Sequence, residues 1–251
     1  MPPKAAMLRS VLLAFCLLST TALAAPAAAP DRVRGEGPFD RLILREVMMV
    51  SGEGAPPVGP VDILIEGNRI AEIRNLGILE PYPEDRRVAV RDGDRVLELA
   101  GHWVLPGFVD MHAHFGGDEQ GVPAEYVAKL WLAHGITTIR EPGSGNGLDW
   151  VLEHRDRSAD NRIAAPRIVP YVFFGQGRDA PFADPEAARQ WVREVARRGA
   201  AGVKFFGAPR AIMIAALDEA EKQGLGTAMH HAQLDVVNWN VLDSARHGLT
   251  T

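Results

Sequence analysis

Two histidines one residue apart carry the clearest chemical signal in this chain. His112 and His114 end the apolar stretch "VLPGFVDMHAHF", residues 104–115. If this stretch is a β-strand, both imidazoles point to the same side, because side chains alternate along a strand. Neutral imidazoles bind zinc well, and paired histidines on one face often begin a metal site. Two buried, hydrogen-bonded histidines would give the same pattern, so other residues must decide between metal binding and packing.

The elements around this pair predict an α/β fold. From Val104 to Thr251, strand-like and amphipathic stretches alternate five times, and "LTT" at the end suits the start of a sixth strand. Such alternation implies parallel βα units. It fits an incomplete (β/α)8 TIM-type barrel, whose sites lie where the strands end. The strands are expected at 107–115, 136–143, 166–177, 200–207 and 225–232, and the helices at 123–135, 147–158, 184–199, 209–224 and 235–248.

A smaller module precedes the barrel. Residues 41–103 hold short runs of alternating apolar and polar residues, separated by turns that contain Gly and Pro. This pattern is typical of strands and predicts a small β-sandwich-like module. Gly67 and Asn68 suit a two-residue hairpin, because both residues tolerate a positive φ.

The first 24 residues resemble a secretory signal peptide. Lys4 and Arg9 precede a short apolar run, and "ALAA" offers small residues for cleavage after Ala24. An uncleaved anchor is the alternative, although the apolar run is short for a membrane span. Residues 25–40 are rich in Pro and Gly and are expected to form a flexible lead-in. The expected location is therefore secreted or periplasmic, with no membrane attachment after cleavage.

The composition limits the classes of partner. The 251 residues are 47% hydrophobic and 24% charged, as in globular proteins, and the net charge is −5. Cleavage after Ala24 removes two basic and no acidic residues, giving −7. This acidic balance argues against a nucleic-acid partner. Cys16 is the only cysteine and lies in the signal segment, so a mature chain has no thiolate ligand. An oligomer is compatible with everything above.

Several motifs together resemble a known family. The stretch "VLPGFVDMHAHF" is similar to the first-strand signature L-P-G-x-x-D-x-H-x-H of the metal-dependent amidohydrolase superfamily, and in particular of its imidazolonepropionase- and dipeptidase-like members. "DILIEGNRIAEI" resembles the N-terminal β-module of that family and "GITTIREPG" its second barrel strand. "GVKFFG" and "MHHAQ" follow where later ligands are expected. The resemblance runs from Arg41 to Thr251.

The resemblance implies four metal ligands: His112, His114, Lys204 and His231. Lys204 matches a lysine that many members carry as a carbamate, an N6-carboxylated side chain that bridges two metal ions. A lysine between Val203 and Phe205 on a buried strand is desolvated, which lowers its pKa and favours the neutral amine that adds carbon dioxide. The alternative is a lysine that extends to solvent at a strand end.

Other positions have weaker assignments. His230 and His231 are adjacent, so only one can face inward from a strand, and the family's His-Ala pattern selects His231. Asp110 matches an aspartate expected to orient a ligand. Arg140 and Glu141 either contact substrate or form an ordinary surface ion pair. Tyr171 and Gln176 are further candidate substrate contacts.

The resemblance implies a hydrolase with one or two divalent metal ions, with Zn2+ as the expected metal, in which a metal-bridging hydroxide attacks an amide or peptide-like C–N bond. Small amides such as N-acyl amino acids, dipeptides or cyclic amides are the expected substrates. The family's sixth-strand histidine and eighth-strand aspartate, the proton shuttle, have no counterpart before Thr251. No catalytic residue is therefore assigned, and the 251-residue chain alone is expected to be weak or inactive.

Two other functions remain in competition. The first is a non-catalytic metal-binding or scaffold fragment of the same family. The second is a sugar- or phosphate-binding barrel with incidental histidines, which the Asp-x-His-x-His pattern and the lack of a glycine-rich phosphate loop disfavour.

The signal-peptide interpretation makes a direct prediction. When the full sequence is expressed in a bacterium, N-terminal sequencing should find a chain that begins near Ala25, in the periplasmic fraction. Recovery of the chain from the cytosol with Met1 intact would contradict the prediction.

Overall fold

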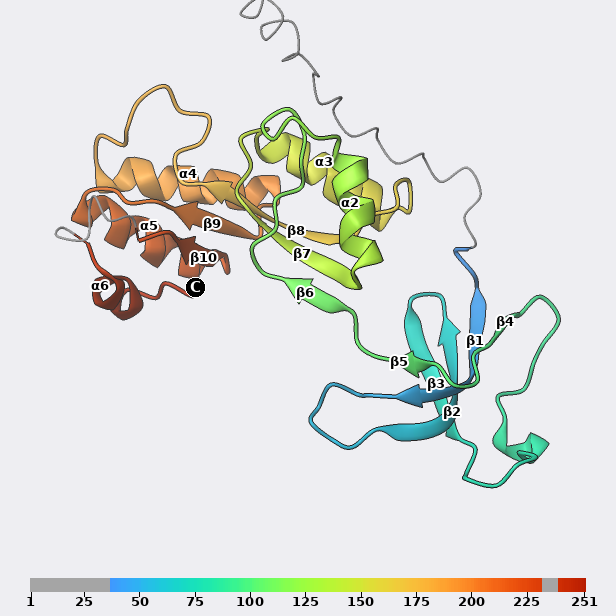
Figure 1. The fold of residues 1–251 in the computed structure, drawn as a ribbon. Helices are drawn as coiled ribbons and strands as arrows, with labels where there is room; N and C mark the ends of the chain where they lie inside the picture. Colours follow the sequence, from blue (N-terminus) through green and yellow to red (C-terminus); the bar gives the residue numbers. More distant parts are fainter. Residues whose placement is uncertain (1–36, 232–238) are drawn as a thin grey trace, which may run out of the picture.

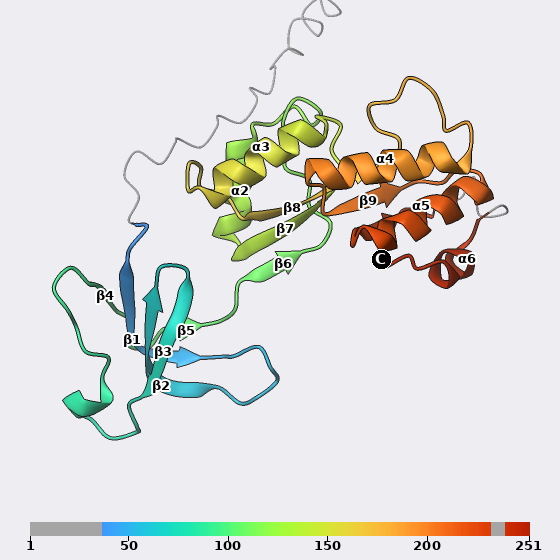
Figure 2. The same cartoon turned by 180° about the vertical axis from the view of Figure 1, so that it is seen from behind.

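The described residues form two five-stranded sheets (Figures 1 and 2). The computed structural model describes residues 37–231 and 239–251, so the predicted signal peptide and most of the lead-in lie outside the described residues. Within them, no helix is both long and apolar enough to cross a membrane. The first sheet forms the predicted N-terminal module, and the second is the predicted parallel sheet of a partial barrel.

The N-terminal module is one sheet with a bent first strand. Its strands are β1 (Arg41–Met49), β2 (Val58–Glu66), β3 (Arg69–Asn75), β4 (Arg95–Glu98) and β5 (Trp103–Val104), with a short 3-10 helix, η1 (Glu84–Arg86). The order is β3-β2-β1-β4, and β5 pairs with the far end of β1. Glu46 has a φ of 60° at a register shift in β1. Buried Asp62 accepts hydrogen bonds from the backbone N–H of Glu46 (3.1 Å) and Val88 (3.3 Å), which stabilises this bend.

Small apolar clusters hold this sheet together. One contains Ile43, Leu64 and Val88, and the other contains Val47, Val61 and Ile63. Because Ile63 and Leu64 are neighbours in β2, the two clusters lie on opposite faces of the sheet. The predicted hairpin joins β2 to β3, but only Gly67 takes a positive φ (57°), and Asn68 does not.

The second sheet is a curled half-barrel of five parallel strands. Its order is β10-β9-β8-β7-β6, so each strand lies beside its neighbour in sequence. Helices alternate with the strands, as the sequence pattern predicts. The elements are β6 (Phe108–Asp110), α2 (Ala124–Ala133), β7 (Ile136–Pro142), α3 (Leu148–Ala159), β8 (Arg167–Phe173), α4 (Pro185–Arg198), β9 (Gly202–Phe205), α5 (Arg210–Lys222), β10 (Gly226–Met229) and α6 (Val241–Arg246).

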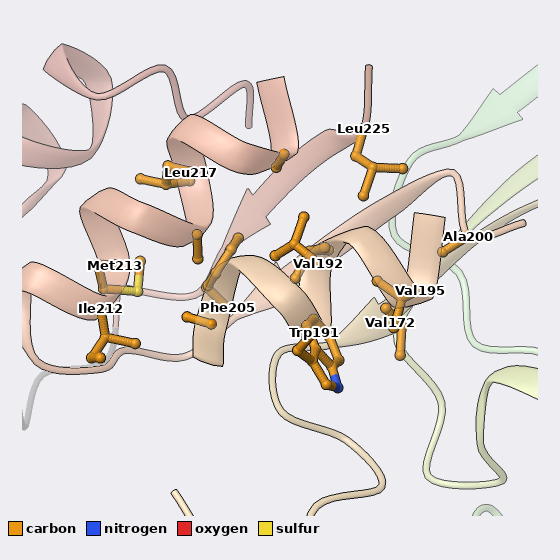
Figure 3. Close-up of a cluster of buried hydrophobic side chains, with 14 of the residues drawn as sticks. Val172, Trp191, Val192, Val195, Ala200, Phe205, Ile212, Met213, Leu217 and Leu225 are labelled. Atoms are coloured by element: carbon orange, nitrogen blue, oxygen red, sulfur yellow. The ribbon is translucent and has the colours of Figure 1, made fainter. Parts of the chain in front are cut away.

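The core of the half-barrel lies between the sheet and its helices (Figure 3). Trp191, Val192 and Val195 on α4 pack with Phe205 of β9 and Met213 of α5. The ends of α4 follow its sequence signals. The Asp184 side chain accepts a hydrogen bond from Ala187 N (2.8 Å), Pro185 occupies the first turn, and Gly199 ends the helix with a φ of 102°.

The strands end earlier than the sequence pattern predicts. β6 ends at Asp110 and β10 at Met229, so the four histidines assigned to these strands follow them in loops. After β6 the chain turns toward β7, where Ala113 N donates to Arg140 O (3.1 Å). Alternation along a strand therefore does not orient His112 and His114, and the argument from strand geometry was wrong at this point.

The last described segments also differ in detail. The final helix was predicted at 235–248, but residues 232–238 lie outside the described residues and α6 begins at Val241. Asn240 fixes this start, because its side chain and that of Asp243 form a reciprocal capping box. Residues 249–251 run along β10, with Thr251 N donating to Thr227 O and Met229 N to Thr251 O, both at 3.0 Å. This pairing agrees with the expected onset of another strand.

Neighbouring phenylalanines on β9 and after it give a stability test. Phe205 is fully buried and Phe206 is 52% exposed. Phe205→Ala leaves a cavity in the main core and should lower the free energy of unfolding by about 3 to 5 kcal/mol. Phe206→Ala should change it by about 0.5 kcal/mol or less. Urea unfolding followed by circular dichroism measures both, and equal losses in the two variants would contradict the assignment of the core.

Candidate functional site

The residues selected from sequence gather where the parallel strands end, the edge at which barrels carry their sites. His112 and His114 follow β6, Arg140 and Glu141 lie near the end of β7, Lys204 is on β9, and His231 follows β10. Their order along the sheet follows the order of the strands.

Lys204 lies inside the half-barrel. It is 5% exposed, and its Nζ lies 5.5 Å from the centre of the Phe206 ring. A lysine that extends to solvent, the alternative, does not agree with this burial. Burial, and then the positive charge of Arg140, lower the pKa of Lys204. The structure therefore favours the neutral amine more than an exposed lysine would.

Lys204 also links two of the histidines electrostatically. The pKa of His112 is lowered by desolvation first, and then by the charges of Lys204, His114 and Arg140, with Asp110 opposing them. The pKa of His231 is lowered by burial and by the charges of His230 and Lys204. Since both imidazoles respond to the same lysine, they share one electrostatic environment. Neutral imidazoles, the form that binds metal, are favoured there.

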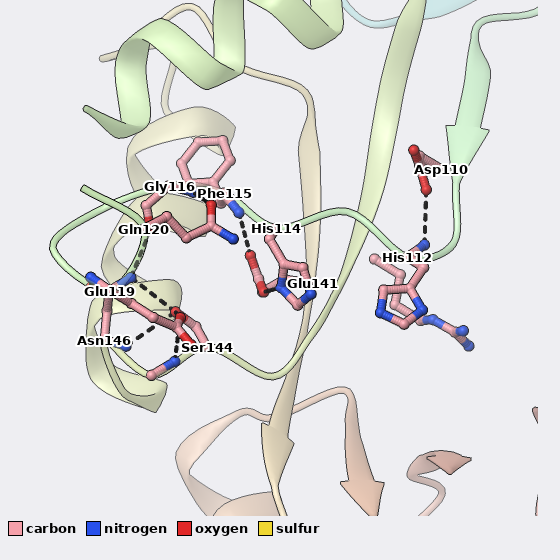
Figure 4. A network of polar contacts seen from close by, with 12 residues as sticks. Asp110, His112, His114, Phe115, Gly116, Glu119, Gln120, Glu141, Ser144 and Asn146 are labelled. Atoms are coloured by element: carbon pink, nitrogen blue, oxygen red, sulfur yellow. Dashed lines mark hydrogen bonds and ion pairs between the residues drawn. The ribbon is translucent and has the colours of Figure 1, made fainter. Parts of the chain in front are cut away.

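Glu141 is the partner of His114 (Figure 4). The carboxylate is 1% exposed and lies 2.8 Å from His114 Nδ1 through its Oε1 atom. Its Oε2 atom accepts a hydrogen bond from Phe115 N at 2.6 Å. Burial raises the pKa of Glu141 to about 7, although the hydrogen bond and charge of His114 act in the opposite direction. With Nδ1 bonded to Glu141, His114 keeps Nε2 for another ligand.

Asp110 acts on the backbone in this structure. Its Oδ1 atom accepts a hydrogen bond from the backbone N of His112 at 2.8 Å, as the dashed line in Figure 4 shows. The aspartate therefore fixes the chain as it leaves β6. This contact orients the His112 residue through its main chain and involves no nitrogen of the ring. The His112 and His114 rings stand 5.4 Å apart, edge to face.

His231 and His230 have different surroundings. His231 Nε2 lies 2.8 Å from Ser244 Oγ on α6. His230 is exposed and its ring lies 5.9 Å from that of Phe206, while its backbone N donates to Phe205 O (3.0 Å). The His231 ring is held by this contact, and the choice of His231 over His230 as a ligand stays a prediction.

The weaker substrate candidates make internal contacts. Arg140 and Glu141 are both buried, so the expectation of a surface ion pair was wrong. Arg140 donates to Met111 O (2.6 Å) and Thr251 Oγ1 (3.0 Å), and its guanidinium lies 5.1 Å from the centre of the Tyr171 ring. Tyr171 itself is 8% exposed.

Tyr171 and Gln176 have packing roles in this structure. A Cβ at Gly226 would lie 1.9 Å from the Tyr171 hydroxyl oxygen, and Gly202 faces the same ring, so two glycines make room for this side chain. Gln176 connects loops: its Nε2 donates to Ser144 O (2.6 Å), and its backbone O accepts from Trp191 Nε1 (3.2 Å). Their proposed contact with substrate stays a prediction.

The donor set suits a divalent metal ion only if Lys204 takes part. Among residues 37–231 and 239–251, no three His, Cys, Asp or Glu side chains gather as a metal cluster. Two histidines nevertheless have the arrangement of metal ligands, in which one ring nitrogen is bonded to the protein and the other remains for the ion. His114 has Glu141 as this partner and His231 has Ser244. A carboxylated Lys204 would add oxygen donors to this set.

Known proteins are similar in sequence to this chain over part of its length. No known family model matches the chain. An adenine deaminase of Klebsiella pneumoniae is 32% identical over 152 residues, covering 57% of this chain and 22% of that protein. Adenine deaminase 2 of Rhizobium etli is 32% identical over 161 residues (61% and 24%), and the imidazolonepropionase of Pseudomonas putida 30% over 100 residues (39% and 23%). Over the aligned residues, this chain is similar to members of the amidohydrolase superfamily.

Solved amidohydrolase-type structures have the same fold. A Xaa-Pro dipeptidase with bound methionine superimposes with a TM-score of 0.58 at 23% identity, covering 83% of this chain and 60% of that one. Molinate hydrolase gives a TM-score of 0.62 at 19% identity (83% and 56%). These matches confirm the half-barrel with a separate sheet. The chain spans about a quarter of the length of the curated amidohydrolase relatives described above, whose names refer to different substrates.

Sequence reasoning missed two partners of the histidines. Glu141 was considered only as a substrate contact or surface ion pair, although an acidic residue on a buried strand is itself a signal that a partner is nearby. Ser244 was not considered at all. On α6, Ser244 is fully buried while Val241 and Leu242 are more than half exposed, the opposite of what their hydrophobicity suggests.

The raised pKa of Glu141 predicts a dependence of stability on pH. In the metal-free protein, the folded state retains a proton between the ordinary pKa of 4.5 and about 7, where the unfolded chain has released it. Protonated Glu141 therefore contributes up to about 3 kcal/mol to the free energy of unfolding. This contribution is complete below pH 4.5 and is lost as the pH rises to 7. Urea unfolding at several pH values should show this fall in wild type and a smaller one in Glu141→Gln. Equal pH slopes would contradict the assignment.

Proposed function

We propose that this chain is the metal-binding part of a hydrolase that acts on C–N bonds of small amides. One observation carries the proposal: buried Lys204 on β9 lies at the same edge of the parallel sheet as His112 and His231, which follow β6 and β10. The names of the relatives, which include deaminases, a dihydroorotase and an imidazolonepropionase, support the same class of reaction.

The proposed ligands are His112, His114, Lys204 and His231, and the proposed metal is zinc. Zn2+ is bound well by imidazole nitrogen and by carboxylate-type oxygen, and the mature chain offers no thiolate. A bound divalent ion would polarise the substrate carbonyl and lower the pKa of a water molecule. One ion or two are both compatible with this donor set.

Lys204 has the environment that carboxylation requires. The neutral amine attacks carbon dioxide, a new N–C bond forms, and one proton leaves the nitrogen, so the product is an anionic carbamate. Burial and Arg140 disfavour the ammonium form, which cannot react. Once formed, the negative carbamate is attracted to Arg140, which repelled the ammonium. Arg140 thus favours both the reactive form of Lys204 and its product.

The remaining residues hold the site in place. An ionised Glu141 would accept the proton of His114 Nδ1 and leave Nε2 to the metal, while Asp110 fixes the main chain at His112. Small substrates such as N-acyl amino acids, dipeptides or cyclic amides are proposed, with Arg140, Glu141 and Tyr171 as weaker candidate contacts. Export to the periplasm or beyond is proposed from the signal-like first 24 residues.

Metal binding tests the proposal first. The purified chain, stripped with a chelator, should bind zinc in a competition titration with a chromophoric chelator. His112→Ala should lose more affinity than the about 10- to 100-fold that removal of an outer partner costs. Lys222→Ala is the matched control for lysine loss, because Lys222 pairs with Asp218 at the surface, and it should bind as wild type does. Lys204→Ala should lose affinity as His112→Ala does.

Turnover separates the enzyme from its competitor. The zinc-loaded chain is assayed on a panel of N-acyl amino acids, dipeptides and cyclic amides, beside His112→Ala. Metal-dependent hydrolysis that His112→Ala abolishes supports the hydrolase. Zinc binding without hydrolysis of any substrate would favour the non-catalytic metal-binding fragment, and absence of zinc binding would contradict both.

A further inference from the structure

One buried hydroxyl on α6 receives contacts from two ring nitrogens. Ser244 is fully buried, and its Oγ atom lies 2.6 Å from Trp239 Nε1 and 2.8 Å from His231 Nε2. The same oxygen lies 3.2 Å from Asn240 O, one turn earlier on the helix. The sulfur of Met229, a weak acceptor, lies 3.6 Å away.

The number of available protons decides which group donates and which accepts in these hydrogen bonds. A serine hydroxyl has one proton to donate and two lone pairs to accept with, whereas an indole N–H only donates. Trp239 therefore donates its N–H to one lone pair of the Ser244 hydroxyl. If the hydroxyl proton goes to Asn240 O, a bond that helical serines commonly make, the second lone pair accepts a proton from His231 Nε2. Every group is then satisfied.

The opposite arrangement leaves one position unused. If Ser244 donated its proton to His231 Nε2, Asn240 O would keep only its hydrogen bond from Ser244 N (3.0 Å), and the hydroxyl would make two hydrogen bonds where the first arrangement gives it three. In a buried place, the arrangement with more hydrogen bonds is the more stable one. The bonding therefore favours the tautomer of His231 that carries its proton on Nε2.

We propose that Ser244, held by Trp239, fixes His231 in the Nε2–H tautomer and so leaves the Nδ1 lone pair for the metal ion. Ser244 is a positioning residue, since it acts through the histidine and touches neither metal nor substrate. The inference rests on the proposed function, because it takes His231 as a metal ligand.

The position of Ser244 is fixed by the start of α6. Asn240 accepts hydrogen bonds from Leu242 N (2.9 Å) and Asp243 N (3.2 Å), and Asp243 forms an ion pair with Arg210 of α5 (3.1 Å). These contacts set the rotation of the short helix, which buries Ser244 while Val241 and Leu242 stay exposed. A hydroxyl occupies the inward position although apolar residues stand beside it in the sequence.

Nitrogen NMR reads the tautomer directly, without activity or added metal. In the metal-free chain labelled with 15N-histidine, correlations from ring protons to ring nitrogens show which nitrogen carries the proton. Wild-type His231 should show protonated Nε2. Ser244→Ala should shift the populations toward Nδ1–H, and Ser244→Thr, which keeps the hydroxyl, should restore Nε2–H.

Zinc affinity shows whether the tautomer matters. Ser244→Ala should bind zinc about 10- to 100-fold more weakly, as loss of an outer partner predicts, with Ser244→Thr close to wild type. Ser158→Ala is the matched control, because Ser158 also donates from a helix to backbone oxygens, Pro166 O among them at 2.9 Å, and it should leave zinc affinity unchanged. Circular dichroism and urea unfolding check that each variant is folded.

The outcomes separate the two proposals. If wild type binds zinc and His231→Ala weakens it, but Ser244→Ala changes neither tautomer nor affinity, the inference about Ser244 is wrong and the proposed function stands. Wild-type His231 with its proton on Nδ1 would overturn the inference as well. If wild type binds no zinc, the proposed function fails, and the spectra of Ser244→Ala alone decide whether Ser244 sets the tautomer.

Discussion

Two cationic side chains share the interior of the half-barrel, and this constraint shapes the site around them. Lys204 is 5% exposed and Arg140 6% exposed. The guanidinium of Arg140 is held by carbonyl and hydroxyl oxygens, with the Tyr171 ring beside it. Burial, and then the positive charge of Arg140, lower the pKa of Lys204. This environment favours the neutral amine, or an anionic adduct, more than an exposed position would.

The histidines are arranged around this pair in a consistent way. Each of two imidazoles has one nitrogen bonded to a buried protein group, Glu141 for His114 and Ser244 for His231. Such partners fix the ring and its tautomer, and they make the remaining nitrogen the one that can bind an ion. The partners come from β7 and α6, elements far apart in sequence, so the site depends on the whole half-barrel for its geometry.

Much of the fold followed from the sequence, and the exceptions have physical causes. The alternation of strands and helices and the caps of α4 were readable, because periodicity and capping residues act locally. The ends of β6 and β10 were not, since the chain leaves the sheet there to bond Arg140 and Phe205 on neighbouring strands. The burial of Lys204 was predictable from its apolar neighbours, Val203 and Phe205. Ser244 was not, because the cap at Asn240 turns α6 so that its serine, rather than its apolar residues, faces inward.

The central claim is that buried Lys204 is reactive toward carbon dioxide. The direct measurement is a carbon NMR spectrum of the chain equilibrated with 13C-bicarbonate and zinc, beside Lys204→Met and Lys222→Met. We expect a carbamate resonance in wild type and Lys222→Met that is absent from Lys204→Met. A spectrum of wild type without a carbamate resonance, or a resonance that persists in Lys204→Met, would contradict the account.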